Sequence, residues 1–583
     1  MLRLARYLKY FKKEVIIGPF FKFLEAVFEL IVPLVMASII DIGIKNGDKA
    51  YVMQKGGVLL LLGAMGLIFA LICQYSAARA SQGVGTMLRN DLFTHINSLS
   101  HREVDLLGTN SLITIITNDV NQIQLAVAML IRLVVRAPFL VIGATVMAMI
   151  LDLKLSLIFL LVAPAVSLVL YIVMRKSVPF YKIRQKLLDK VSLITRENLS
   201  GARVIRAFSK QEKEEARFKE ANNDVARVAI RVGRISAILN PATFTILNFS
   251  IIVIIWFGGM RVDAGILTQG EIIAFVNYMT QISLALVVVA NLVVIFTKAS
   301  ASASRINKLF DMVSSIEDKG TTNPVELNKG DKTKPLISIR NMSFAYEGAE
   351  EYSLMDVNLD VYRGETIGII GGTGSGKSTL VNLLPRFYDV SKGEILIDGV
   401  PIGDYKLGDL RRRFGIVPQK AVLFYGSILE NMRFAKEDAT IDEIIKAIEI
   451  AQAKDFVERM PEKYETMIMQ GGKNLSGGQK QRLTIARALV GSPDILIFDD
   501  SFSALDYATD ASLRKALKRH CNEATVFMVS QRANTIKNVD KIIVLDDGKV
   551  VGIGKHKELL KDCEIYREIC LSQLSEEEVA RHD

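Results

Sequence analysis

The most specific chemistry in this sequence lies in a run of glycine and small polar residues. The run reads Gly371-Gly372-Thr373-Gly374-Ser375-Gly376-Lys377-Ser378, followed by Thr379, and fits the spacing G-x-x-x-x-G-K-[ST]. Glycines let backbone N–H groups wrap phosphate oxygens, and the N-terminus of a following helix attracts anions. We therefore expect Lys377 to reach the β- and γ-phosphates of a nucleotide and Ser378 to ligate Mg²⁺.

A second candidate is an apolar run that ends in two carboxylates. Residues 495–498 are all hydrophobic, and Asp499 and Asp500 follow them directly. In α/β nucleotide-binding domains, an acidic residue at the carboxyl end of a buried strand completes the Mg²⁺ site. Asp499 is predicted to take that role, whereas the residue types alone leave Asp500 open between a site residue and a surface residue.

A third candidate is the segment Ser476-Gly477-Gly478-Gln479, which precedes a predicted helix over residues 481–490. A glycine-rich helix N-terminus is able to hold an anion. By residue type alone such a segment is more often an ordinary loop. Its position between the phosphate loop and the acidic strand makes it a candidate for nucleotide binding.

These three segments need a soluble α/β framework to position them. Strand-like alternation occurs at residues 336–344, and an apolar strand at 366–370 runs into the phosphate loop and then into a helix over 379–384. We predict a nucleotide-binding domain over residues 336–583. A polar linker with glycine and proline over 316–335 joins it to an N-terminal domain over residues 1–315.

The N-terminal domain has the pattern of a membrane protein. Four uncharged stretches of 20 to 26 residues, 56–78, 155–174, 235–260 and 272–297, are each long enough to cross a bilayer as a helix. Two more candidates, 15–40 and 127–151, are interrupted by charges. The predicted fold class is a membrane α-helical domain, with six transmembrane helices and long cytoplasmic extensions, followed by an α/β P-loop nucleotide-binding domain. Breaks at 105–111 and 198–201 favour short crosswise helices at the tips of two extensions.

The charge distribution supports the membrane interpretation. The net charge is +10, of which residues 1–320 contribute +14 (36 Lys and Arg against 22 Asp and Glu). A basic excess in the hydrophobic half argues against a nucleic-acid partner. Sixteen basic residues within 175–236 indicate the cytoplasmic side. We expect a multi-pass protein of the cytoplasmic membrane with both termini cytoplasmic and no cleaved signal peptide.

The sequence also allows predictions for the four cysteines and for three charged residues of the first predicted span. The four cysteines show no disulfide or metal-ligand spacing and are expected to be free thiols: Cys73, Cys521, Cys563 and Cys570. Lys22, Glu25 and Glu29 share one face of the first predicted span. They either pair with one another or line a transport pathway.

The combined motifs resemble those of ATP-binding cassette exporters, and the whole chain resembles a half-transporter with six membrane helices and one nucleotide-binding domain. The resemblance implies that Tyr346 stacks on adenine and that Gln419 approaches Mg²⁺ and the attacking water. Such cassettes act as head-to-tail pairs, so it also implies that Ser476, Gly477, Gly478 and Gln479 complete the ATP site of a second chain. Residues 503–506 would contact that chain.

Two positions depart from the family pattern. Asp500 stands where the family has Glu, and Gln531 stands where it has a switch histidine. Asp is one methylene shorter than Glu, and the amide of Gln does not take up a proton near neutrality. We therefore expect the site to bind ATP but to hydrolyse it slowly. The pattern resembles the degenerate-site subunit of heterodimeric bacterial multidrug exporters, which implies a partner half-transporter with intact Glu and His.

The predicted function is therefore ATP-driven export of a small hydrophobic or amphiphilic substrate by a protein that lies in the lipid bilayer. Aromatic and Met residues of the first half suit such a substrate, although lipid-facing helices have similar residues. A lipid exporter, a slow homodimeric transporter and an ATP-gated regulatory or channel subunit remain as alternatives. The expected spans exclude an ATPase without a membrane domain.

Overall fold

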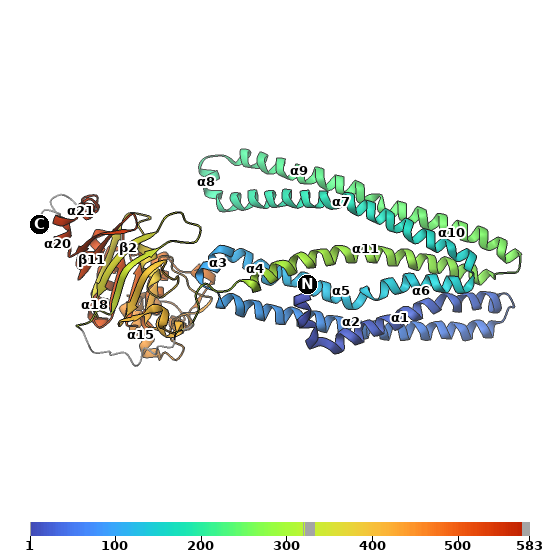
Figure 1. Ribbon diagram of the computed structural model, residues 1–583, viewed down its shortest axis with the longest axis horizontal. Coiled ribbons are helices and arrows are strands. Elements are labelled where there is room, and N and C mark those ends of the chain that lie inside the picture. The colour runs from blue at the N-terminus through green and yellow to red at the C-terminus, as the bar shows by residue number, and fades with distance from the viewer. Residues whose placement is uncertain (1, 319, 321–332, 574–583) are drawn as a thin grey trace. The chain divides into compact units, whose positions relative to one another are not determined.

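The computed structural model describes residues 2–318, 320 and 333–573, and the chain divides into two compact units (Figure 1). The helical unit contains Met1–Asn97 and Gly108–Met312, and the α/β unit contains Ser98–Leu107 and Val313–Asp583. Most of the expected linker, residues 319 and 321–332, lies outside the described residues.

Six long helical stretches make up most of the helical unit (Figure 1). Several stretches change helix type or bend along their length. Their elements are η1 (Leu2–Phe11), α1 (Lys12–Ser38), η2 (Ile39–Ile44), α2 (Lys49–Ser98), α4 (Thr109–Thr114), η3 (Ile115–Asp119), α5 (Val120–Met129), η4 (Leu130–Val134), α6 (Arg136–Leu151), α7 (Leu153–Ser200), α8 (Ala202–Ala207), α9 (Gln211–Ala237), α10 (Leu239–Asp263) and α11 (Gln269–Asp311).

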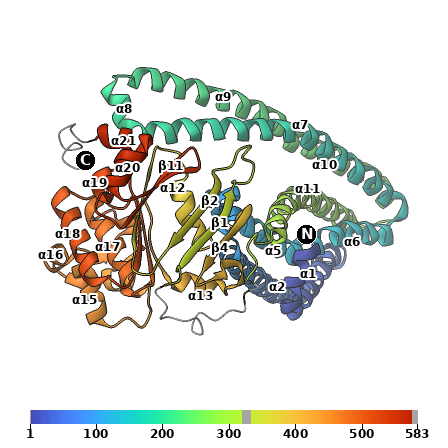
Figure 2. The ribbon, with the colours of Figure 1, turned by 60° about the vertical axis from the view of Figure 1, so that its left-hand side comes forward.

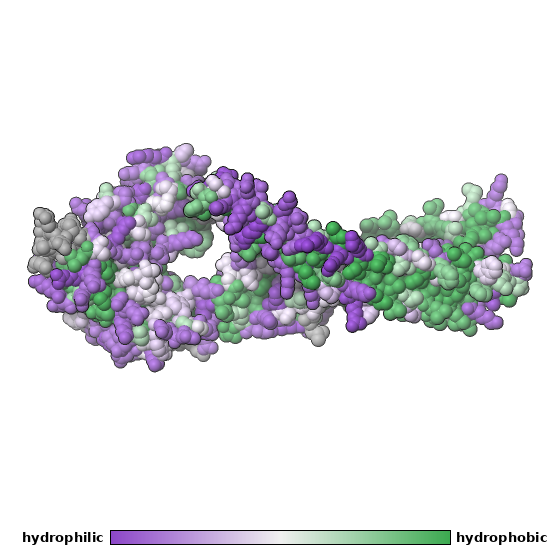
Figure 3. All heavy atoms as spheres, turned by 90° about the horizontal axis from the view of Figure 1, so that it is seen from above, coloured by the Kyte–Doolittle hydropathy of each residue, from purple (hydrophilic) through white to green (hydrophobic). Residues whose placement is uncertain are grey.

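All six stretches are long and apolar enough to cross a membrane, which confirms the six predicted spans. Each contains 42 to 53 residues. Because about 20 residues suffice for a bilayer, the helices extend well beyond it. On the face shown in Figure 3, hydrophobic residues form a band over the right-hand part of the helical unit, and hydrophilic residues cover much of the remaining length.

The core of the helical unit forms where α11 packs against α1, α6 and α10. Small residues let these helices approach closely: a Cβ atom on Gly143 would come within 2.4 Å of Leu30. The charges of the first span are paired within this unit. Lys22 Nζ lies 2.8 Å from a Glu25 carboxylate oxygen, and Glu29 forms a 2.8 Å ion pair with Arg136 of α6.

The α/β unit contains a six-stranded sheet in the order β12-β11-β3-β10-β9-β6 and a four-stranded sheet in the order β2-β1-β4-β5. In the larger sheet, β11, β3, β10, β9 and β6 are parallel. Its strands are β3 (Thr366–Gly371), β6 (Phe414–Val417), β9 (Ile495–Asp499), β10 (Thr525–Val529), β11 (Lys541–Asp546) and β12 (Lys549–Gly554). Strands β9 and β10 are buried throughout, as expected for parallel strands covered on both faces.

The smaller sheets and the helices complete this unit (Figure 2). Two short strands, β7 and β8, pair separately, and α15, α17 and α18 pack together. The elements are β1 (Ile337–Phe344), β2 (Leu354–Val361), β4 (Lys392–Ile397), β5 (Val400–Pro401), β7 (Gly426–Ser427), β8 (Met467–Ile468), α12 (Lys377–Leu383), η6 (Ile402–Asp404), α13 (Leu407–Arg412), α14 (Ile428–Arg433), α15 (Ile441–Ile450), α16 (Lys454–Glu458), η7 (Lys463–Glu465), η8 (Gln470–Gly472), α17 (Gly477–Val490), α18 (Tyr507–His520), α19 (Ala533–Ile536), α20 (His556–Asp562) and α21 (Glu564–Leu571).

One helix of the α/β unit comes from the first half of the chain. Helix α3 (His101–Leu107) follows α2, but the Tyr388 hydroxyl donates to Asp105 over 2.9 Å and the His101 ring packs on Phe387. Gly108, with φ +72°, separates α3 from α4, so the predicted break at 105–111 lies between two short helices. The buried Glu103 accepts hydrogen bonds from Ser100 and Ser315. The second predicted break also has a short helix beside it, because α8 begins after Gly201.

Candidate nucleotide-binding site

Four neighbouring parallel strands deliver the predicted site residues to one edge of the larger sheet. The phosphate loop follows β3, Gln531 follows β10, Asp499 ends β9 and Gln419 follows β6. These four strands are adjacent in the order β3-β10-β9-β6. Since the carboxyl ends of parallel strands meet at the same edge, residues far apart in sequence converge there.

A cleft of about 340 Å³ opens at this edge. Eleven of the predicted residues line it: Tyr346, Thr373, Gly374, Gly376, Lys377, Ser378, Thr379, Gln419, Asp499, Asp500 and Gln531. Ser353, Val529 and Ser530 also line it. Sequence reasoning missed Ser353 because it precedes β2 and belongs to no motif. Gly371, Gly372 and Ser375 are not among the residues that line the cleft; Gly371 and Ser375 are buried, whereas Gly372 is exposed.

The phosphate loop adopts a backbone that requires glycine. Gly374 and Gly376 have φ angles of +87° and +93°, in the left-handed region that glycine enters most easily. A Cβ atom on Gly376 would also lie 2.7 Å from the carbonyl oxygen of Ser353. Lys377 begins α12, and its Nζ donates to the carbonyl oxygen of Gly371 over 3.0 Å. Burial lowers the pKa of Lys377, against the opposing effect of Asp500 and Asp499.

Oxygen donors suited to Mg²⁺ lie together in the cleft. Ser378 Oγ donates to Asp499 Oδ1 over 2.9 Å, and Asp499 is buried at the end of β9. Gln419 and Asp500 line the same cleft. Burial raises the pKa of both Asp499 and Asp500, and the neighbouring Ser378 and Gln419 side chains partly offset this effect at Asp499 and Asp500 respectively. Mg²⁺ prefers such carboxylate, amide and hydroxyl oxygens, so Ser378, Asp499 and Gln419 fit this ion.

The two departures from the family pattern both line the cleft. Asp500 has a left-handed backbone with φ +45°, and its carbonyl oxygen accepts a hydrogen bond from Ser503 Oγ over 2.8 Å. Gln531 is exposed and follows β10 by two residues. Its neighbour Arg532 donates to the carbonyl oxygen of Ser503 over 3.3 Å. The segments that carry Asp500 and Gln531 are therefore linked through Ser503, which hydrogen-bonds to Asp500 and to Arg532.

An aromatic cluster lies at one end of the cleft. Tyr346 packs edge-to-face against Tyr388 and Phe344, with ring centroids 5.4 Å and 4.9 Å apart. Its hydroxyl lies 3.2 Å from Thr379 Oγ1, and 38% of the residue is exposed. A ring that is held at its edges and partly exposed offers a face for stacking on a flat base.

Comparison with known proteins identifies the family. Residues 15–286 match the family described as "ABC transporter transmembrane region", and residues 354–503 match the family "ABC transporter". The chain is an ABC transporter. It is 36% identical over 547 residues to an "Uncharacterized ABC transporter ATP-binding protein" of Mycobacterium tuberculosis, with 93% of each chain covered.

Other relatives and a solved structure agree with this assignment. A Bacillus subtilis protein named "Putative multidrug export ATP-binding/permease protein" is 33% identical, covering 96% of this chain and 97% of that protein. An "ATP-dependent lipid A-core flippase" of Hahella chejuensis is 32% identical, with 86% and 85% covered. The solved structure of a bacterial Atm1-family ABC exporter with ATP bound superposes with a TM-score of 0.81 at 25% identity, covering 97% and 99%. This transporter is thus an ABC exporter half-transporter, and its nucleotide-binding domain is an ATPase coupled to transport.

The glycine-rich segment of this transporter forms the start of α17. Ser476 caps the helix by accepting from the N–H of Gln479 over 3.3 Å, and Gln479 Oε1 accepts from the N–H of Ser476 over 2.9 Å. This reciprocal capping box starts the helix at Gly477, earlier than the predicted residue 481. Among the described residues that line the cleft, none comes from this segment.

Proposed function

We propose that this chain is one subunit of a heterodimeric ATP-driven exporter of hydrophobic or amphiphilic compounds. Its own cleft holds ATP and turns it over slowly. The observation that carries the proposal is that Asp500 and Gln531 both line the cleft at positions where the family has Glu and His. A carboxylate that is one methylene short and an amide that takes up no proton weaken water activation while leaving phosphate binding intact.

In the proposed mechanism, the phosphate-loop amides and Lys377 bind the phosphates, and Tyr346 stacks on the adenine. Ser378, Asp499 and Gln419 would hold Mg²⁺, which would supply positive charge to offset the charge of the phosphates. Asp500 orients the attacking water, but its shorter reach leaves this water poorly aligned. Gln531 donates its amide N–H to the γ-phosphate and does not transfer a proton.

The segment of Ser476, Gly477, Gly478 and Gln479 would complete an ATP site on a second half-transporter. Its capping box orders the first turn of α17, and the segment does not line this chain's own cleft within the described ranges. The free amides of a helix N-terminus favour an anion such as the γ-phosphate. The second chain would supply its own Glu and His, so that hydrolysis occurs mainly at the shared site.

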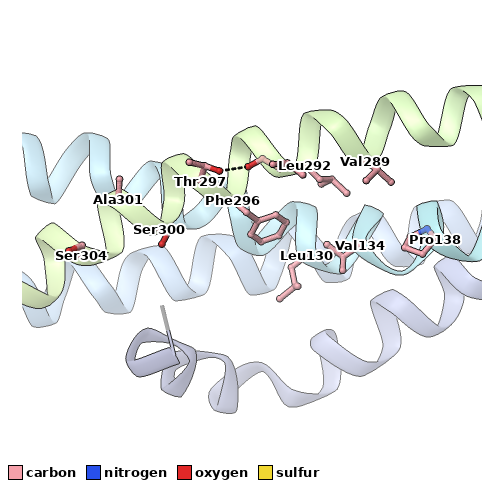
Figure 4. Close-up of a pocket in the computed structure, with 11 residues that line it drawn as sticks. Leu130, Val134, Pro138, Val289, Leu292, Phe296, Thr297, Ser300, Ala301 and Ser304 are labelled. Atoms are coloured by element: carbon pink, nitrogen blue, oxygen red, sulfur yellow. Dashed lines mark hydrogen bonds between the residues drawn. The ribbon is translucent and has the colours of Figure 1, made fainter. Parts of the chain in front are cut away.

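An apolar groove in the helical unit supports a hydrophobic or amphiphilic substrate. The groove has a volume of about 950 Å³ and lies between η4–α6 and α11, with Phe296, Leu130 and Val134 directed into it (Figure 4). Its remaining lining residues are uncharged: Pro138, Val289, Leu292, Val293, Thr297, Ser300, Ala301 and Ser304. This size and lining match a drug-sized ligand. The relative from Bacillus subtilis is named for multidrug export.

Lipid export is a second candidate, because the relative from Hahella chejuensis is named as a lipid A-core flippase and the groove is equally suited to acyl chains. In either case we propose that both termini are cytoplasmic, in a multi-pass protein of the cytoplasmic membrane. The basic residues within 175–236 favour that orientation, and the cleft must face the compartment that contains ATP.

The decisive experiment compares the ATPase activity of the purified chain alone with that of the chain co-expressed with a half-transporter that has Glu and His at the two divergent positions. We expect little activity alone and strong activity together. Replacing Ser476 with Ala should abolish most of the joint activity while leaving ATP binding by this chain alone unchanged. Full activity of the chain alone would reject the heterodimer, and unchanged joint activity in the Ser476→Ala variant would reject the shared site.

A further inference from the structure

The segment that carries Gln531 is held by a side chain from the far end of the chain. Gln573 Nε2 donates to the carbonyl oxygen of Gln531 over 2.7 Å. The backbone N–H of Ala533 donates to Gln573 Oε1 over 2.9 Å. One amide group thus uses its donor and its acceptor on backbone groups on either side of Arg532, and it fixes the segment immediately next to the cleft.

Gln573 is exposed and follows α21 by two residues, and α21 itself is anchored in the core. Tyr566 and Cys570 of α21 are fully buried, in the same hydrophobic core as Ala533 and Ile536 of α19. Tyr566 also hydrogen-bonds to His556 of α20, with 2.7 Å between its hydroxyl and Nδ1. Figure 2 shows α19, α20 and α21 side by side. The C-terminal helix and the segment of Gln531 therefore share one rigid support.

We infer that Gln573 is a positioning residue that holds Gln531 toward the γ-phosphate, so that the end of α21 determines how strongly the cleft prefers ATP over ADP. This inference rests on the proposed role of Gln531. Without Gln573, the Gln531 carbonyl and the Ala533 N–H would turn to water, and the segment would sample other conformations. Each neutral hydrogen bond changes such an equilibrium by a factor of about 2 to 10.

The test uses the full-length protein in lipid nanodiscs and measures the dissociation constants of Mg²⁺-AMP-PNP and Mg²⁺-ADP. In the Gln573→Ala variant we expect AMP-PNP binding to weaken by about three- to tenfold. ADP binding should stay within about twofold, because ADP has no γ-phosphate for Gln531 to contact. Ser572→Ala is the matched control, since within the described part of the chain its hydroxyl donates to the Ile569 carbonyl of α21. It should change neither constant.

The same measurement in a Gln531→Ala background separates positioning from general stability. Gln531→Ala should itself lower the preference for AMP-PNP, and adding Gln573→Ala should then have no further effect. An equal loss of both nucleotides in Gln573→Ala, or a loss that persists without the Gln531 side chain, would overturn the inference. A silent Gln573→Ala beside an effective Gln531→Ala would reject the positioning role alone. A Gln531→Ala variant with unchanged preference would reject the proposed role of Gln531 and this inference with it.

Discussion

Replacing Asp500 with Glu and Gln531 with His should restore rapid ATP hydrolysis to this chain's own cleft. Both side chains line the cleft, and Asp500 lies there together with Gln419. The added methylene extends the carboxylate by slightly more than about 1 Å. A displacement of about 1 Å changes rates by about 10²-fold, and a positioned proton-transfer group contributes about 10²- to 10⁴-fold. We therefore expect the double variant to hydrolyse ATP at least about 10²-fold faster than the wild type.

The structure also predicts what this change does to stability. Asp500 has φ +45°, a left-handed conformation that Asp tolerates better than longer side chains. Glu at this position should lower the free energy of unfolding by up to about 1–2 kcal/mol. Asp356 on β2 has φ +47° and is exposed, so Asp356→Glu is a matched control for strain alone. It should lower the melting temperature without changing hydrolysis.

The assay is single-turnover hydrolysis of radiolabelled ATP by the purified chain, with Lys377→Ala as the blank. Nucleotide affinity is measured on the same samples, so that a change in rate is not confused with a change in binding. A double variant that binds Mg²⁺-ATP as well as the wild type and still hydrolyses it at the wild-type rate would refute the reasoning. Other residues would then limit turnover.

Three further predictions concern contacts within one unit. Tyr388→Phe removes the hydroxyl that donates to Asp105; nucleotide affinity should stay within about twofold, while the melting temperature should fall, because a hydrogen bond that holds α3 to the α/β unit is lost. The pKa of Glu103 is lowered, because hydrogen bonds from two serines outweigh the effect of burial. The ionised Glu103 carboxylate therefore stabilises the folded state fully at any pH above 4.5, the ordinary pKa of Glu. This stabilisation is lost as the pH falls through the lowered pKa of Glu103 in the folded protein. The melting temperature of Glu103→Gln should lie a few degrees (roughly 2–4 °C per kcal/mol) below wild type at neutral pH, with a gap that shrinks in acid. In the helical unit, Glu29→Gln leaves Arg136 unpaired and should reduce thermal stability, whereas the swap Glu29→Arg with Arg136→Glu should retain it. A single variant as stable as the wild type would contradict a structural role for this pair.

Much of the site could be predicted because its chemistry is local in the sequence. The phosphate loop needs glycines at positive φ between a strand and a helix, and Gly374 and Gly376 lie within three residues of Lys377. Asp499 could be placed because an apolar strand leads directly to it. Helix α17 begins at Gly477, four residues before the predicted start, because Ser476 and Gln479 form a capping box there.

Other features depend on partners that are distant in the sequence. Glu29 pairs with Arg136, which lies on another helix, and its neighbours Lys22 and Glu25 pair with each other. Ser353 lines the cleft, and its carbonyl oxygen lies close to Gly376, 23 residues further along the chain. Gln573 belongs to no sequence motif, so the sequence alone does not predict its contact with the segment of Gln531.

By itself, the sequence determined the existence of six membrane-spanning helices and the identity of the phosphate-binding loop, because helix length, hydropathy and glycine spacing act between residues that are close along the chain. Only the tertiary structure decided which of the candidate residues share one cleft. That outcome depends on the order β3-β10-β9-β6 in the sheet, and strand order arises from packing between segments separated by up to about 160 residues. The tertiary structure also decided that α3 belongs to the α/β unit, where Tyr388 donates a hydrogen bond to Asp105. No local sequence pattern encodes this contact, because the two residues lie far apart along the chain.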